Sequence, residues 1–429
     1  MSISTTLRVR QGALVRRRAA LPLLGLIFAA LMLGGTLPIP LYTLWAPKLG
    51  FGALTTTLIF AAYTVGTIVA LLTLATLSDQ AGRRPLLLAA IAGIAISTAL
   101  FLLADSVVVL LLARLLSGAA TGVVTATATA GLNELDDDAG GTRSVRTATL
   151  ANMGGLGLGP IVAGVLAWAV GDPTHTVFWV YLVILIPAVA AVWSLPETVS
   201  QPHRPQLQLH RPLLPGRADR APFAHAAALT FVAFSILGLF SSLVPAFLGD
   251  VLQERNLAIV GVIVGSVFLV AASTQLALNP DRARKALAAA PLILIAGLAG
   301  IEAGLWAKSL GLFLAGTAAS GVGIGVAFKG AITSTHDLAE PAHRAGLTAT
   351  LFLAAYTGLT IPTVIVGVLN QSMSARSATL IVASVVALLA LVAPALRSRT
   401  RTSATASQSG SRGDAPRPMQ APGRRWFAG

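Results

Sequence analysis

The sequence predicts an all-α integral membrane protein, with twelve transmembrane helices in two pseudo-symmetric six-helix bundles. Its composition excludes an ordinary soluble domain, because 55% of the 429 residues are hydrophobic and only 11% are charged, whereas soluble domains carry roughly a quarter charged residues. Apolar runs long enough to cross a bilayer follow one another along the chain. Short polar and glycine-rich motifs recur in the two halves, and this repeat predicts the pseudo-symmetry of the two bundles.

Each apolar run is expected to form a helix. Lipid offers backbone groups no hydrogen-bond partner, and the runs are too long and too continuously apolar for the alternating strands of a barrel. The first run could be mistaken for a secretory signal, but it continues past Ala30 to Leu41 without a convincing cleavage site. In chain order, the expected spans lie near 21–41, 53–75, 86–104, 107–130, 147–170, 177–195, 223–247, 257–278, 287–304, 309–331, 346–369 and 377–396.

The distribution of basic residues sets the expected orientation. The chain has 30 Lys and Arg against 16 Asp and Glu, a net charge of +14. Nearly all the basic residues fall on one side of the membrane once the N-terminus is placed inside, as the positive-inside rule requires. The charge therefore needs no nucleic acid as a partner. We expect a multi-pass protein of the plasma or inner cell membrane, with both termini in the cytoplasm.

A repeat at an offset of 202 to 203 residues divides the spans six plus six. Asp79 corresponds to Asp281, and the Ser-Gly pair at Ser117 corresponds to the pair at Ser320. The polar stretch between the halves is expected to be a cytoplasmic linker. The predicted organisation is a basic cytoplasmic N-terminal tail (1–20), a first bundle (21–195), the linker (196–222), a second bundle (223–396) and a disordered basic cytoplasmic tail (397–429).

The turn after the second span carries a family signature. Residues 75–85 read ATLSDQAGRRP and resemble the Gly-x-Leu-Ala-Asp-Arg-x-Gly-Arg-Lys loop of the major facilitator superfamily, with alanine and glutamine in place of the first glycine and the first arginine. Gly82 permits a tight turn, and Asp79 near a membrane surface needs a positive partner, such as a helix N-terminus or an arginine. In this superfamily the aspartate locks one half against the other in the outward-facing state. The resemblance thus implies a cytoplasmic gate formed by Asp79, Gly82, Arg83 and Arg84.

The fourth span contains one arginine. It reads LLARLLSGAATG and resembles the superfamily pattern Arg-x-x-Gln-Gly, with Ser117 in the glutamine position. Arg114 would lie roughly 10 Å inside the outer membrane edge at 1.5 Å per residue. A charge at that depth costs at least ~2.5 kcal/mol and normally faces a cavity or a partner. We expect Arg114 to have a functional role; snorkelling to the outer surface or pairing with a backbone carbonyl are the alternatives.

The fifth span resembles the antiporter signature of the same superfamily. Its sequence NMGGLGLGPIVAG matches the pattern Gly-x-x-x-Gly-Pro-x-x-Gly-Gly with one alanine replacement. Glycines allow another helix to approach closely, and proline bends a span. The expected hinge consists of Gly155, Gly159, Pro160 and Gly164. Because this signature goes mostly with exporters, the resemblance to the twelve-helix drug/proton antiporter branch favours efflux.

The energy source is expected to be an ion gradient. The sequence has no phosphate-binding loop, no metal-binding cluster and no nucleophile-base arrangement, so we expect no enzymatic activity, no cofactor and no metal. Few acidic residues fall within the spans. Glu302 lies two residues from the predicted outer end of the ninth span, where water would reach it. Proton coupling would run through Asp79, Glu134 or Glu302, or indirectly through Arg114, and uncoupled transport stays open.

The expected substrate cavity is mostly apolar. The residues within the spans that could face it are aromatic or neutral, although side chains of this kind more often serve ordinary packing than ligand contact: Tyr63, Asn152, Phe234 and Tyr356. These side chains suit a lipophilic or uncharged small molecule. We expect a monomeric secondary transporter that exports such a molecule by alternating access, in exchange for protons. A sugar or nutrient permease of the same fold, or a receptor-like membrane protein without transport, are the alternatives.

Overall fold

The molecule is a bundle of long helices. The computed structural model describes residues 3–74, 77–138, 141–199, 213–216, 219–338, 340 and 344–410. Every regular element in these ranges is helical. Eleven helices are long and apolar enough to cross a membrane, and a twelfth span results when two helices joined at a 67° bend are counted together. The predicted all-α membrane fold is therefore confirmed.

The described part of the first half contains six spans and two short helices, α2 and α4, beside them. Their bounds are α1 (Ile3–Thr36), α2 (Tyr42–Leu49), α3 (Ala53–Thr73), α4 (Leu77–Ala81), α5 (Arg83–Leu102), α6 (Val107–Leu135), α7 (Thr142–Thr149), the π-helix η1 (Leu150–Gly154), α8 (Gly155–Ala169) and α9 (Pro173–Ser194). The segments α7, η1 and α8 together make the fifth span. We call the end of the bundle with the α4–α5 turn the Asp79 end, and the end with α2 and the start of α9 the Asp172 end.

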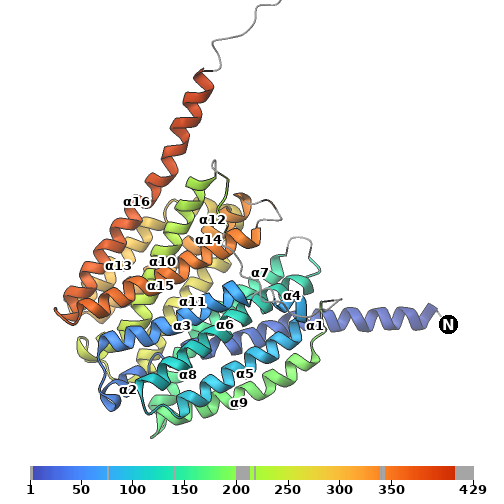
Figure 1. Cartoon of the computed structure of the whole chain (residues 1–429), viewed down its shortest axis with the longest axis horizontal. Coiled ribbons are helices and arrows are strands. Elements are labelled where there is room, and N and C mark those ends of the chain that lie inside the picture. Colours follow the sequence, from blue (N-terminus) through green and yellow to red (C-terminus); the bar gives the residue numbers. More distant parts are fainter. Residues whose placement is uncertain are drawn as a thin grey trace, which may run out of the picture.

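The second half repeats this back-and-forth path beside the first half (Figure 1). Its helices are α10 (Arg220–Asp250), α11 (Leu257–Ala277), α12 (Pro280–Ala286), α13 (Ala290–Trp306), α14 (Leu310–Leu338), α15 (Arg344–Leu369) and α16 (Ala375–Gly410). The bent pair is α12 and α13. Pro291, in the first turn of α13, has no N–H to donate and its ring opposes a continuous helix through the bend.

Both terminal helices are longer than the predicted spans. Helix α1 begins at Ile3 and α16 ends at Gly410, and both extensions project beyond the bundle in Figure 1. Residues 1–20 and 397–429 were expected as tails outside the bundle. Arg and Ala, which are frequent in the two extensions, favour helix, and a helix once formed adds residues easily. The rest of the second tail, 411–429, and residues 200–212 of the linker lie outside the described residues.

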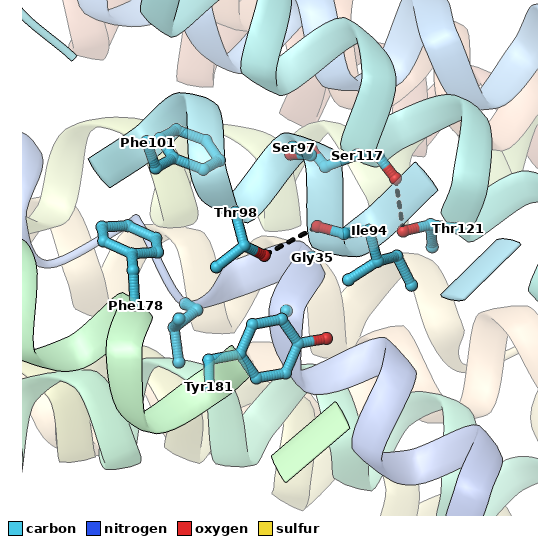
Figure 2. A pocket seen from close by; sticks show the side chains of 11 residues that line it. Gly35, Ile94, Ser97, Thr98, Phe101, Ser117, Thr121, Phe178 and Tyr181 are labelled. Carbon is cyan, nitrogen blue, oxygen red and sulfur yellow. Dashed lines mark hydrogen bonds between the residues drawn. The ribbon is translucent and has the colours of Figure 1, made fainter. Parts of the chain in front are cut away.

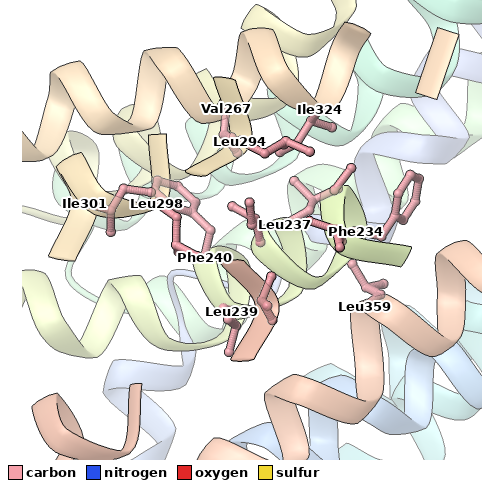
Figure 3. Close-up of a cluster of buried hydrophobic side chains, with 14 of the residues drawn as sticks. Phe234, Leu237, Leu239, Phe240, Val267, Leu294, Leu298, Ile301, Ile324 and Leu359 are labelled. Atoms are coloured by element: carbon pink, nitrogen blue, oxygen red, sulfur yellow. The ribbon is translucent and has the colours of Figure 1, made fainter. Parts of the chain in front are cut away.

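Buried apolar side chains form two large clusters. One is built from the helices of the first half, and the other from the second half with three additions, Ile39, Phe60 and Met153, from the first. Figure 3 shows part of the second cluster, where Leu237 and Phe240 of α10 face Leu294 and Leu298 of α13. Helix α10 is thus the central helix of the second half.

The two halves pack most closely near the Asp172 end. A Cβ on Gly164 of α8 would lie 2.2 Å from the carbonyl oxygen of Leu257 at the start of α11, and one on Gly261 would lie 2.2 Å from that of Pro160. A Cβ on Gly367 of α15 would lie 2.2 Å from Oγ1 of Thr57 near the start of α3. These positions accept only glycine without a shift of the neighbouring helix.

Candidate functional site

A cavity of about 600 Å³ lies between the two halves. Side chains from α1, α3, α6 and η1 line one side of it, and side chains from α10, α11, α14 and α15 line the other. All four residues predicted for the cavity are among them: Tyr63, Asn152, Phe234 and Tyr356. The structure thus brings together residues that lie up to 293 positions apart in the sequence.

The cavity reaches one end of the bundle. Asp79, Arg83, His336 and Arg344 line it there, and all four lie at the Asp79 end, in α4, at the start of α5, near the end of α14 or at the start of α15. At the Asp172 end the halves are closed by the glycine contacts of α8 with α11 and of α15 with α3. Among the described residues, the cavity lining thus reaches the Asp79 end and does not reach the Asp172 end.

The α4–α5 turn is held by ion pairs within the first half. The Arg83 guanidinium lies 2.6 Å from the Asp79 carboxylate and 2.5 Å from the Glu134 carboxylate, and its Nε also donates to Glu134 at 3.2 Å. The bond to Ser78 Oγ is 2.5 Å long. Arg83 is only 8% exposed. Its ion pair with Glu134 is the stronger one, because two hydrogen bonds join the two side chains. Asp79, 59% exposed, contributes less.

Glu197 is a member of this site that sequence reasoning missed. Its carboxylate accepts the backbone N–H of Arg83 at 2.8 Å and that of Arg84 at 3.0 Å, where the first turn of α5 has no helical partner for these donors. Gly82 has φ +106°, and a Cβ there would lie 2.8 Å from Glu197 Oε2. The glycine is therefore required for the backbone conformation and for the approach of Glu197.

Arg84 reaches to the end of the sixth span. Its guanidinium donates to the carbonyl oxygen of Trp193 at 2.5 Å and lies 5.7 Å from the centre of the Trp193 ring. Together with Glu197, this contact ties the start of α5 to the end of α9. The predicted loop residues are thus brought into one network with Glu134, Trp193 and Glu197.

The second half contains a matching arrangement. Arg284 forms ion pairs with Asp281 and, at 2.7 Å, with Asp337. Asp337 follows Glu134 by 203 residues, which is the offset of the sequence repeat. Each half therefore has an acid-arginine-acid set at the Asp79 end, and the acid at the end of α14 was not recognised from sequence.

Arg114 is fully buried but does not line the cavity. It donates to the Gly35 carbonyl oxygen at 2.7 Å and to the Tyr42 hydroxyl. Its guanidinium carbon lies 5.4 Å from the centre of the Tyr42 ring and 5.2 Å from that of Tyr63. Of the two alternatives raised from sequence, snorkelling is excluded by burial, and pairing with a backbone carbonyl is what the structure shows.

The chain itself explains why Gly35 needs this donor. Helix α1 ends at Thr36, and the next residues include Pro38 and Pro40, which have no N–H. The N–H of Ile39, four residues after Gly35, donates to Thr36 instead. The Gly35 carbonyl therefore lacks a backbone donor, and a cation at a helix C-terminus also interacts favourably with the helix dipole.

A second cavity adjoins this region but has a volume of only about 10 Å³. Figure 2 shows it among Gly35, Ser117, Thr121 and Tyr181, with the Thr121 hydroxyl donating to the Ser117 carbonyl at 2.7 Å. This volume is at the lower limit for one water molecule. The half of the first bundle near the Asp172 end is therefore closely packed, and the larger cavity is the candidate substrate site.

Glu302 was expected where water would reach it, and this expectation is wrong. The residue is 7% exposed, and within the described part of the chain neither carboxylate oxygen has a hydrogen-bond partner. Helix α13 packs on α14, α16 and α10. Gly300 and Gly304 meet α14, and at 100° per residue Glu302 points away from these two glycines. It lies outside the cavity lining.

The predicted hinge residues occupy two faces of α8. On one face, a Cβ on Gly155 would lie 2.5 Å from the Ala29 carbonyl oxygen of α1, and one on Gly159 would lie 2.3 Å from Thr36 Oγ1. On the other face, Pro160 and Gly164 contact α11 of the second half. The hinge segment is thus fixed to its own half and to the opposite half at once.

Comparison with known proteins identifies the family. The sequence model of the Major Facilitator Superfamily matches residues 24–301, which is more than half of the chain. The chain belongs to the Major Facilitator Superfamily. Members of this superfamily are membrane transporters.

A curated relative in the superfamily is similar over a shorter stretch. The major facilitator-type transporter psiT2 of Psilocybe cubensis is 35% identical to this superfamily member over 112 residues, which make up 26% of this chain and 21% of psiT2. The aligned stretch thus spans about a fifth of that relative. It supports the family assignment.

Solved structures share the superfamily fold. The crystal structure of the human organic anion transporter MFSD10 (TETRAN) has a TM-score of 0.61 and 16% identity, covering 88% of this chain and 99% of that one. A bacterial homologue of the human lysosomal transporter Spinster, in an inward-facing and unoccupied conformation, has a TM-score of 0.67 and 15% identity, with 90% and 97% covered. At this level of identity the likeness concerns the fold alone.

Proposed function

We propose that this member of the superfamily is a secondary active exporter of a small, lipophilic or uncharged molecule, driven by exchange for protons and acting as a monomer in the cell membrane. The observation that carries the proposal is the cavity between the halves, which reaches the Asp79 end and is closed at the Asp172 end. With both termini in the cytoplasm, as the basic residues favour, the cavity faces the cytoplasm, where an exported molecule binds first.

In the proposed cycle the two halves rock about the central cavity. Opening at the Asp172 end separates α8 from α11 and α3 from α15, and the Asp79 end closes. Asp79 then exchanges its contact with Arg83 for a contact across the halves, as the loop resemblance implies. Arg83 keeps Glu134, so the α4–α5 turn stays ordered while Asp79 changes partner.

The coupling proton is proposed to bind at Glu302 or at the Asp79–Arg83–Glu134 set. Glu302 supports the first choice, because burying a carboxylate without a partner costs far more than burying its protonated form. An intramembrane acid is a functional candidate by default. Arg114 would act indirectly, by fixing the end of α1.

The direct test is transport by the purified protein in lipid vesicles with an imposed pH gradient, using a panel of lipophilic and uncharged toxic compounds. We expect at least one compound to move against its own gradient when protons flow the other way. Movement that ignores the pH gradient would remove proton exchange from the proposal. Equal sensitivity to these toxic compounds in cells with and without the gene would argue against export.

Replacing Asp79 with asparagine is expected to reduce transport at least ten-fold with little loss of stability. The reason is that Asp79 is largely exposed and its ion pair contributes at most ~1 kcal/mol, while Arg83 retains Glu134. The measurement pairs initial transport rates with thermal unfolding. Asp281→Asn is the matched control, because it removes an exposed acid from the equivalent turn of the second half. Equal effects of the two substitutions would contradict a special role of the Asp79 turn.

Replacing Glu302 with glutamine is expected to abolish accumulation driven by a pH gradient while downhill movement continues. Glutamine has nearly the same shape and no charge, so this buried position tolerates it. Transport with and without the gradient is measured in the same vesicles. Glu254→Gln, in the turn between α10 and α11, is the control. If the Glu302 variant still accumulates substrate when a pH gradient is imposed, Glu302 is not the proton site, and the Asp79–Arg83–Glu134 set is the remaining candidate.

A further inference from the structure

The second half gives the cavity a wall of four aromatic rings. They are Phe234 of α10, Phe328 of α14, and Phe352 and Tyr356 of α15. Ring centres lie 5.1 Å apart for Phe234 and Phe328, 5.8 Å for Phe328 and Phe352, 6.3 Å for Phe352 and Tyr356, and 6.5 Å for Tyr356 and Phe234. Each ring therefore contacts two others. We call this set the aromatic wall.

The first half gives the cavity most of its hydroxyl and amide groups, beside the rings of Phe60 and Tyr63, and the second half adds Ser241, Gln275 and Thr348. The polar wall of the first half consists of Thr36, Thr125, Thr129, Asn133, Thr149 and Asn152. The hydroxyl of Thr36 donates to the Leu156 carbonyl at 2.6 Å, and that of Thr125 to the Thr121 carbonyl at 2.9 Å. These protons are thus used within the protein, and the hydroxyl oxygens remain as acceptors for a bound molecule.

Two amides of the polar wall keep both kinds of hydrogen-bonding group available. Asn133 and Asn152 line the cavity, and neither side chain forms a hydrogen bond with any described residue. Asn152 lies on the π-helix η1, and an extra residue in a helical turn of this kind often serves to direct a side chain into a functional site. Each amide can donate and accept.

Charge is confined to one end of the cavity. Among the described residues that line it, the one carboxylate is that of Asp79 and the cations are Arg83 and Arg344, all at the Asp79 end. Between the two walls a charged ligand would meet no opposite charge. A cation over an aromatic face gains about 2 kcal/mol when desolvated, whereas removing an unpaired ion from water costs several kcal/mol. The space between the walls therefore favours neutral molecules.

We propose that the cavity binds planar aromatic molecules of zero net charge that carry a hydroxyl or amide group, with the ring against the aromatic wall and the polar group hydrogen-bonded to Asn133 or Asn152. This inference rests on the proposed function, because it names the substrate class of the same cavity. A volume of about 600 Å³ lies within the ~300–1,000 Å³ of small-molecule sites, so a molecule of two or three fused rings fits.

The test is equilibrium binding to the full chain in lipid nanodiscs, corrected with empty nanodiscs. The probes are 2-naphthol, its saturated analogue decahydro-2-naphthol, and the anion 2-naphthalenesulfonate. We expect 2-naphthol to bind about ten-fold more tightly than the saturated analogue, since aromatic pairs gain about 0.5–1.5 kcal/mol each beyond burial. We also expect it to bind more tightly than the sulfonate, which has no partner between the walls.

Substitutions in each wall measure how much that wall contributes to the binding of 2-naphthol. Phe328→Leu and Phe352→Leu are expected to reduce the preference for 2-naphthol over the saturated analogue about five-fold. Phe240→Leu is the matched control, because that ring stacks on Phe313 in the core and lies outside the cavity lining. Asn152→Ala is expected to weaken 2-naphthol binding about five-fold and to leave naphthalene binding unchanged.

Equal binding of 2-naphthol and its saturated analogue overturns the inference, as does tighter binding of the sulfonate. A Phe240→Leu effect as large as that of Phe328→Leu also overturns it. Failure of the proposed function is recognised separately in the vesicle assay. If the protein transports other compounds but shows no preference for aromatic ones, only the proposed substrate class is wrong. If it binds 2-naphthol with that preference but transports nothing, the exporter function is wrong and the binding site stands.

Discussion

Replacing Gly164 with alanine is expected to reduce transport at least ten-fold and to shift the protein away from the conformation that is closed at the Asp172 end. The added Cβ would lie 2.2 Å from the Leu257 carbonyl oxygen and 3.0 Å from the Gly261 Cα. Both neighbours belong to the backbone of α11, so no flexible side chain can move aside. Overpacking of this kind costs about 1–3 kcal/mol, and 1.4 kcal/mol is about a ten-fold change in a conformational equilibrium.

The chain contains no cysteine, so the shift can be measured with one introduced thiol. Thr348 lines the cavity near the Asp79 end. A Thr348→Cys background is expected to react rapidly with a membrane-impermeant maleimide added on the Asp79 side, and several-fold more slowly once Gly164→Ala favours opening at the other end. Gly154→Ala is the matched control, because a Cβ on Gly154 of η1 meets no atom within 4 Å. Equal labelling and transport in the two alanine variants would show that the α8–α11 contact does not control the equilibrium.

The parts of the fold that depend on local sequence were predictable. Apolar runs of sufficient length gave the spans, because a bilayer imposes that length on any helix that crosses it. The four cavity residues Tyr63, Asn152, Phe234 and Tyr356 were selected as polar or aromatic groups within apolar spans, and all four line the cavity. Their role in binding stays a prediction that the naphthol experiment tests in part.

The parts that depend on contacts between distant segments were not predictable. Glu197 lies in the predicted linker, 114 residues from Arg83, and no local pattern connects it with the start of α5. Glu302 lies close to a span end, which suggested contact with water. It is nevertheless only 7% exposed, and a hydropathy profile contains no information about which neighbouring helices cover a helix end.

Arg114 shows how a pattern can indicate an important residue without its contacts. The free-energy cost of an arginine inside the membrane indicated that Arg114 has a role, but the sequence did not indicate that the Gly35 carbonyl oxygen accepts its hydrogen bond. In the structure, Arg114 lies between the rings of Tyr42 and Tyr63. Since Tyr63 also lines the cavity, the arginine connects the end of α1 with the cavity wall although it does not line the cavity itself.

Charge and geometry at Arg114 can be separated with two substitutions. Hydrogen bonds of a charged group contribute about 1.5–3 kcal/mol each, and each cation–π contact up to about 2 kcal/mol when desolvated. Together these offset much of the cost of placing the charge in the membrane, which is at least ~2.5 kcal/mol. Lysine keeps that cost but lacks the planar fork that reaches Gly35 and Tyr42 at once. Glutamine loses the charge and keeps an amide that can donate to the Gly35 carbonyl.

We therefore expect Arg114→Lys to lower the thermal unfolding temperature more than Arg114→Gln, and both to lose most transport because the end of α1 and the Tyr63 ring are no longer fixed. Thermal unfolding and vesicle transport are measured side by side. Tyr42→Phe is the control that removes one acceptor and keeps the ring, and a smaller loss of stability is expected from it. Wild-type stability and transport in the lysine variant would show that a positive charge alone suffices at this position. The simultaneous contacts of the planar guanidinium with Gly35 and Tyr42 would then not be required for function.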